Sequence, residues 1–240
     1  MKLRALSLAL AMAVTAAPAS AAQFYVTYTG TITSLISNKG GAFGEAPQGG
    51  LTGAGFTAVY TLTLPTAGAT TTSDAEAIGA SGSGGANPVR GAITINGVTQ
   101  QFGQASGSAY LRNSPGLVDT IQFAAYNSRN DAVQTATDSL IMPVSSFTRD
   151  FVTALDFGQP FTYTTQAGDQ ADTALVISRY LFATAQATDF TAALHIATVT
   201  VSDISPAPEP ASWAMMLVGF ALVGGAIRRR RADQAADWAD

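Results

Sequence analysis

Side chains that could perform catalytic chemistry are few in this 240-residue chain. It has no cysteine, which removes disulfides, thiolate metal sites and cysteine nucleophiles. The one histidine, His195, lies in TAALHIATVTV, where strand alternation would place it on one face with Ala197, Val199 and Val201. This setting predicts a packing residue rather than a general base, and a single histidine excludes zinc sites built from several.

Carboxylates could supply an acid–base pair or a calcium site. A glycosidase needs two facing carboxylates, and the only glutamates between residues 22 and 207, Glu45 and Glu76, lie in stretches rich in small residues. Asp169 and Asp172 in AGDQAD could provide oxygen ligands for calcium, but they lack the repeated spacing of a calcium loop. We therefore predict no catalytic residue, no metal and no cofactor, and we rank a secreted hydrolase as an unfavoured alternative.

Two kinds of binding surface are open as further alternatives. Tyr110, Tyr126 and Tyr163 are candidate platforms for sugar rings, which makes a carbohydrate-binding module the main alternative function. Threonines at 27–33 and 57–63 are similar to the hydroxyl arrays of ice-binding proteins, although threonine is also common on solvated strands. Residues 22–207 include six basic and twelve acidic side chains, and this negative balance argues against nucleic acid as a partner.

The elements that carry these residues are predicted to be short antiparallel strands. QFYVTYTGTITS and GFTAVYTLTL alternate apolar and polar residues with a period of two, and Asn96-Gly97 in AITINGVTQQF is typical of a hairpin turn. Further predicted elements are strands at 108–112, 117–126, 174–182 and 192–201, a turn at 113–116, a short helix at 147–155 and surface loops at 40–55 and 67–88. The pattern predicts a mainly β fold over residues 22–204, an antiparallel β-sandwich that could be of the jelly-roll kind.

The N-terminus has the three parts of a secretory signal peptide. Lys2 and Arg4 precede an apolar run at 5–17, and the small residues Ala19 and Ala21 fit the specificity of signal peptidase. The apolar run is too short to span a bilayer. We predict export through the secretory translocon and cleavage after Ala21, so that residues 1–21 are removed.

A second apolar segment, 211–227, lies near the C-terminus. As a helix it would rise about 25 Å, slightly less than a hydrocarbon core of about 30 Å. Trp213 suits the headgroup zone at one end, and the cluster Arg228, Arg229, Arg230 and Arg231 favours the cytoplasm at the other. We therefore predict a single transmembrane helix with the β domain outside and an acidic tail, 232–240, in the cytoplasm.

Pro208, Glu209 and Pro210 stand just before this predicted helix, in a segment that its prolines keep extended. The order of PEP motif, WA-containing apolar helix and arginine cluster over 205–231 resembles the PEP-CTERM sorting domain of Gram-negative bacteria. The resemblance implies that Pro208, Glu209 and Pro210 are the recognition motif of an exosortase, the helix a transient anchor in the inner membrane and the arginines a stop signal. This chain departs from the usual pattern by continuing past the arginines with ADQAADWAD.

Taken together, these segments predict an exported protein of the cell surface or extracellular matrix with a non-enzymatic structural or interaction role. The expected partners are signal peptidase, the translocon, an exosortase and the inner membrane during sorting. Extracellular polysaccharide is a further candidate partner, since a mildly acidic surface is compatible with such a matrix.

Overall fold

The computed structural model describes residues 21–39, 41–44, 50–182 and 184–204. The predicted membrane span at 211–227 lies outside these ranges. Within them, no helix is long and apolar enough to cross a membrane. The described residues contain twelve strands and one short 3-10 turn, Gly84–Ala86. The strands are β1 (Ala22–Lys39), β2 (Gly55–Leu64), β3 (Thr70–Ser73), β4 (Ala77–Ser83), β5 (Val89–Ile95), β6 (Val98–Phe102), β7 (Ser106–Arg112), β8 (Asp119–Asn130), β9 (Gln134–Ser146), β10 (Phe161–Thr164), β11 (Asp172–Leu181) and β12 (Gln186–Ile204).

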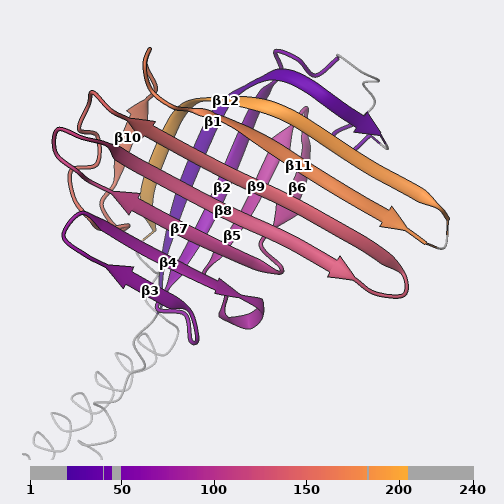
Figure 1. Cartoon of the computed structure of the whole chain (residues 1–240), viewed down its shortest axis with the longest axis horizontal. Helices are drawn as coiled ribbons and strands as arrows, with labels where there is room; N and C mark the ends of the chain where they lie inside the picture. Colours follow the sequence, from indigo (N-terminus) through magenta and orange to yellow (C-terminus); the bar gives the residue numbers. More distant parts are fainter. Residues whose placement is uncertain (1–20, 40, 45–49, 183, 205–240) are drawn as a thin grey trace, which may run out of the picture. The chain divides into compact units, whose positions relative to one another are not determined.

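These strands form one antiparallel sheet, which confirms the predicted mainly antiparallel β structure. Their order is β3-β4-β7-β8-β9-β11-β12-β1-β2-β5-β6, and β10 pairs with β12 beside this path. The sheet curls so that β2 and β5 cross behind β7, β8 and β9 (Figure 1). The two halves pack face to face, but hydrogen bonds continue from one half to the other through β12 and β1. The chain therefore forms a single curled sheet rather than the predicted sandwich of two separate sheets.

Bulges in the longest pair of strands allow this curl. The pairing of β1 with β12 shifts register after Thr29, Ile32 and Leu35. Each extra residue at a bulge bends the strand and increases its twist, which lets two long strands turn from one layer into the other. Gly30 stands at the first shift, where a Cβ atom would lie only 1.9 Å from the carbonyl oxygen of His195. A side chain at position 30 is therefore incompatible with this turn.

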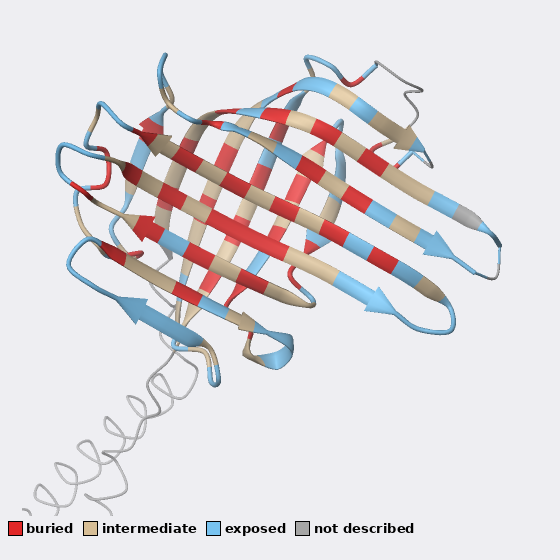
Figure 2. Cartoon of the chain, in the orientation of Figure 1, coloured by how far each residue is buried: buried red, intermediate tan, exposed pale blue. Residues whose placement is uncertain are grey.

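The strand faces predicted from alternation are confirmed for β1 and β2. Val26, Tyr28 and Ile32 are buried on β1, and every second residue of β2 from Phe56 to Leu62 is buried. Figure 2 shows the resulting alternation of buried and partly exposed residues along the strands. The predicted hairpin is also present, since Asn96 and Gly97 join β5 to β6 with φ angles of 50° and 76°. Positive φ at both positions is the signature of a tight hairpin turn.

Two local predictions are wrong. The stretch 67–88 is not a simple loop, because it contains β3 and β4. The small residues of β4 hid its strand character, and they are needed there: a Cβ atom on Gly82 would lie 2.0 Å from the carbonyl oxygen of Ala86. The predicted helix at 147–155 is absent as well. In its place the backbone N–H groups of Phe151 and Val152 donate to the buried carboxylate of Asp119 at 2.6 and 2.7 Å.

Two tyrosines in the core differ in their hydrogen bonding. The rings of Tyr28 and Tyr60 meet edge to face at 5.8 Å, and both side chains are fully buried. The hydroxyl of Tyr60 donates to the carbonyl oxygen of Leu140 at 2.9 Å, whereas the hydroxyl of Tyr28 has no hydrogen-bond partner. A buried polar group without a partner costs about 1–3 kcal/mol of stability.

This contrast predicts opposite effects of the same substitution. We expect Tyr28→Phe to raise the free energy of unfolding by about 1 kcal/mol, because it removes an unsatisfied hydroxyl, and Tyr60→Phe to lower it by a similar amount. Urea denaturation of the two variants measures both changes. Equal losses of stability in both would contradict the prediction.

Candidate functional site

Most residues of the predicted sorting and processing signals lie outside the described part of the chain. These are Ala19, Pro208, Glu209, Pro210, Trp213, Arg228, Arg229, Arg230 and Arg231. Ala21 is the first described residue, and β1 begins directly after it. The assigned roles of these residues therefore stay predictions.

His195 does not pack on the face that alternation predicted. Thr29 lies opposite Thr198 and Gly30 lies opposite Ile196, so Ala197 is an extra residue in β12. This bulge reverses the phase of the strand, which leaves Val199 buried and His195 exposed. The Nδ1 atom of His195 lies 2.7 Å from a carboxylate oxygen of Asp172, whose side chain is 82% exposed.

The two aspartates of the calcium alternative have different partners. Asp172 meets His195, while Asp169 bonds to Arg149 at 2.9 Å and accepts the hydroxyl of Tyr163 at 2.5 Å. Burial alone would raise the pKa of Asp169, but hydrogen bonds from Tyr163 and from a backbone N–H, with the charge of Arg149, hold it below its ordinary value. Among the described residues, no three acidic or histidine side chains gather as metal ligands.

The candidate tyrosine platforms differ in exposure. Tyr110 is 36% exposed, and Tyr126 lines a groove of about 440 Å³ floored mainly by serine and glycine residues of β4 and β7. Tyr163 is buried and stacks on Phe151 with ring centroids 4.2 Å apart, so its predicted exposure is wrong. Side chains alternate between the two faces of β10, and the threonines on either side of Tyr163 point outward. Tyr163 therefore points inward.

One row of the sheet consists of threonine alone. Its members, from β10 across β12, β1, β2 and β5 to β6, are Thr164, Thr198, Thr29, Thr57, Thr94 and Thr99. The hydroxyl oxygens of Thr29 and Thr198 are 2.6 Å apart, and those of Thr94 and Thr99 are 2.7 Å apart. Such cross-strand pairs stabilise a sheet. The twist of the sheet turns successive strands out of a common plane. The ice-binding alternative stays a prediction.

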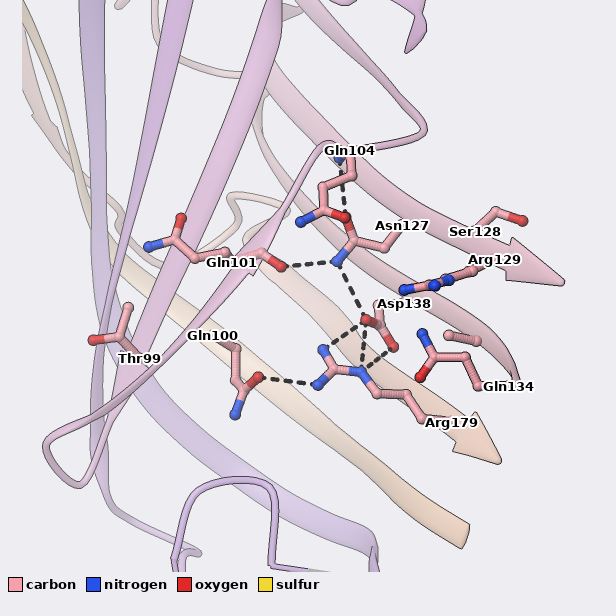
Figure 3. Close-up of a pocket in the computed structure, with 11 residues that line it drawn as sticks. Thr99, Gln100, Gln101, Gln104, Asn127, Ser128, Arg129, Gln134, Asp138 and Arg179 are labelled. Atoms are coloured by element: carbon pink, nitrogen blue, oxygen red, sulfur yellow. Dashed lines mark hydrogen bonds and ion pairs between the residues drawn. The ribbon is translucent and has the colours of Figure 1, made fainter. Parts of the chain in front are cut away.

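The structure reveals a site that the sequence did not indicate, a polar cleft of about 540 Å³ between the two layers (Figure 3). β6 forms one wall, and the inward faces of β8, β9 and β11 form the other. Its lining residues are Thr99, Gln100, Gln101, Gln104, Asn127, Ser128, Arg129, Gln134, Ala136, Asp138 and Arg179. This set is called the polar cleft from here on.

Asp138 lies at the centre of the polar cleft and is only 2% exposed. It accepts three hydrogen bonds from Arg179, from Nη2 at 2.7 Å and from Nε at 2.9 and 3.2 Å, and a fourth from the side-chain amide of Asn127 at 3.2 Å. Nη1 of Arg179 also donates to the side-chain oxygen of Gln100 on β6, at 3.3 Å. The network thus ties both walls of the cleft together, as the dashed lines in Figure 3 show.

A second ion pair lies at the rim of the cleft. Arg129 contacts Asp131 in the turn between β8 and β9, and both side chains are largely solvated. Hydrogen bonds from the backbone of Gln134, from Arg129 and from the backbone of Val133 lower the pKa of Asp131 to about 2. Asp131 is therefore ionised at any physiological pH and keeps Arg129 neutralised.

The polar cleft lies far from the ends of the domain. Arg179 is opposite Thr188 near the start of β12, whereas Ile204, the last residue of β12, is opposite Gln23 in β1. The sixteen residue steps from Thr188 to Ile204 give a contour length of roughly 50 Å at about 3.3 Å per step. Ile204, the last described residue, therefore lies at the end of β12 opposite to the end that pairs near the cleft.

Sequence reasoning missed the polar cleft because its charged members are widely separated. Asp138 and Arg179 are 41 residues apart, and only the curl of the sheet brings Gln100 against them. The one sequence signal available was the local group of glutamines in TQQFGQ, which lies at the end of a predicted hairpin.

Comparison with known proteins identifies the C-terminal segment alone. The family model described as the PEP-CTERM protein-sorting motif matches residues 206–231, in agreement with the resemblance noted from the sequence. No curated protein and no solved structure matches the chain. The matched motif implies an exported protein that is sorted to the cell surface, with an exosortase as its processing partner.

Proposed function

We propose that this chain is a non-enzymatic protein of the cell surface or extracellular matrix, whose β domain acts as an interaction module. The match of residues 206–231 to the sorting motif supports the surface location in this proposal. In the proposed route the signal peptide 1–21 is removed, and the helix 211–227 holds the domain in the inner membrane with Arg228 to Arg231 in the cytoplasm. The exosortase then cleaves near Pro208-Glu209-Pro210 and releases the domain outward.

The position of the polar cleft supports an interaction role. A domain held through the residues that follow Ile204 would present the opposite end of β12, and with it the cleft, away from the point of attachment. The chemistry of Asp138 supports binding over catalysis. All the hydrogen bonds of its carboxylate go to Arg179 and Asn127, whereas a general acid or base must reach the proton that it transfers.

Fractionation of the native host with an antibody to the β domain tests the proposed route. We expect a form that lacks both ends, clearly smaller than the 24.6 kDa of the full chain, at the cell surface or in the medium. N-terminal sequencing of that form should begin at Ala22. Full-length protein confined to the inner membrane would refute the proposal.

A further inference from the structure

Two polar side chains of the polar cleft have no partner within the protein. The carboxamides of Gln104 and Gln134 make no hydrogen bond with any described residue, although both side chains line the cleft. A carboxamide offers two donor hydrogens and an acceptor oxygen in one plane. The cleft therefore presents unused donors and acceptors on both of its walls.

The charges of the cleft are already balanced. Asp138 neutralises Arg179, and Asp131 neutralises Arg129. An anionic ligand would have to displace a carboxylate from its arginine, and a cation would compete with the four hydrogen bonds that Asp138 already accepts. This balance favours a ligand that is polar but uncharged.

An extended peptide is also disfavoured. β6 is an edge strand of the sheet, and free strand edges commonly accept another strand. Here the side chain of Asn127 covers that edge, since its amide donates to the carbonyl oxygen of Gln101 at 2.8 Å and its oxygen accepts from the backbone N–H of Gln104 at 3.0 Å. An added strand would therefore have to displace the Asn127 side chain from the carbonyl oxygen of Gln101.

We propose that the polar cleft binds a neutral saccharide, with the carboxamides of Gln104 and Gln134 bonding to sugar hydroxyl groups and Arg179 held in place by Asp138 as a further donor. A polyhydroxylated, uncharged ligand matches the unused groups, and about 540 Å³ lies within the size range of small-ligand sites. The inference rests on the proposed function, because a domain displayed at the surface meets extracellular polysaccharide.

Calorimetric titration of the full chain tests this inference, in micelles of a detergent without a sugar headgroup. The probes are neutral oligosaccharides of glucose, mannose and galactose, with an oligosaccharide of galacturonate as the charged comparison. We expect at least one neutral probe to bind and the galacturonate probe to bind more weakly. The double variant Gln104→Ala/Gln134→Ala should weaken binding about 10- to 30-fold, through the loss of two uncharged hydrogen bonds.

Gln159→Ala is the matched control, because Gln159 is exposed on a loop and does not line the cleft. It should bind like the parent. The inference is overturned if no neutral probe binds, if galacturonate binds more tightly than every neutral probe, or if the double variant and the control bind equally. Each of these results would leave processing by the exosortase unchanged, so failure of the ligand and failure of the sorting route are distinguishable.

Discussion

Replacing Glu209 by alanine is expected to abolish processing and to leave full-length protein in the inner membrane. Glu209 is the central residue of the Pro208-Glu209-Pro210 motif, within the segment that matches the sorting family. The substitution changes neither the signal peptide nor the apolar length of 211–227, so export and membrane insertion should continue. Immunoblots of membrane, surface and medium fractions from the native host measure the outcome.

Glu45→Ala is the control for this experiment, because it removes a glutamate that lies outside the matched segment. It should be processed like the parent. Deletion of Arg228 to Arg231 should act differently, by weakening retention of the C-terminus in the cytoplasm. If the Glu209 variant and the parent were identical in size and location, the helix would be a permanent anchor and the sorting mechanism would be excluded.

The second large effect is expected at Asp138. Asp138→Ala should lower the free energy of unfolding by about 2–4 kcal/mol, because it removes the carboxylate that pairs with the Arg179 guanidinium and accepts one of the hydrogen bonds of the Asn127 amide. The estimate lies below that for a fully buried pair, since the side chain of Arg179 is 33% exposed and water can solvate it in part. Urea denaturation of the processed protein provides the measurement.

Asp131→Ala is the matched comparison, because it breaks an aspartate–arginine pair that lies in solvent. The side chains of Arg129 and Asp131 are 61% and 36% exposed, so we expect little change in stability. Asp138→Asn should fall between the two, as it keeps an acceptor oxygen but loses the charge. Equal stability of the Asp138 and Asp131 variants would show that the network does not hold the layers together.

The sequence predicted the strands in which large apolar side chains alternate with threonine. The strand at Gly55–Leu64 and the turn at Asn96-Gly97 are present as predicted, because periodicity and positive φ are local properties. β4 was missed because Ile78 is its one large apolar residue, and a single such residue among Ala, Gly and Ser does not mark a face. The helix at 147–155 was predicted wrongly because two backbone N–H groups of that segment donate hydrogen bonds to Asp119, which lies more than 25 residues earlier in the sequence.

The functional residues of the domain were harder to predict than its strands. One extra residue at Ala197 reversed the face of His195, and a bulge of this kind leaves no trace in an alternating pattern. The polar cleft depends on the curl of the sheet, which places Gln100 of β6 beside Arg179 of β11. Contacts between distant strands follow from topology, and alternation within one strand does not determine topology.

The pairing of the first strand with the last has a consequence for the timing of export. β12 lies between β11 and β1 in the sheet, and in the proposed export it would be the last of the described strands to emerge from the translocon. Until residues 186–204 have crossed, β1 has no partner on that side and the two halves of the sheet are not joined. Contacts of such long sequence separation form slowly. We therefore expect the sheet of the β domain to be completed only after β12 has been exported, at about the time when the sorting motif at 206–231 reaches the membrane.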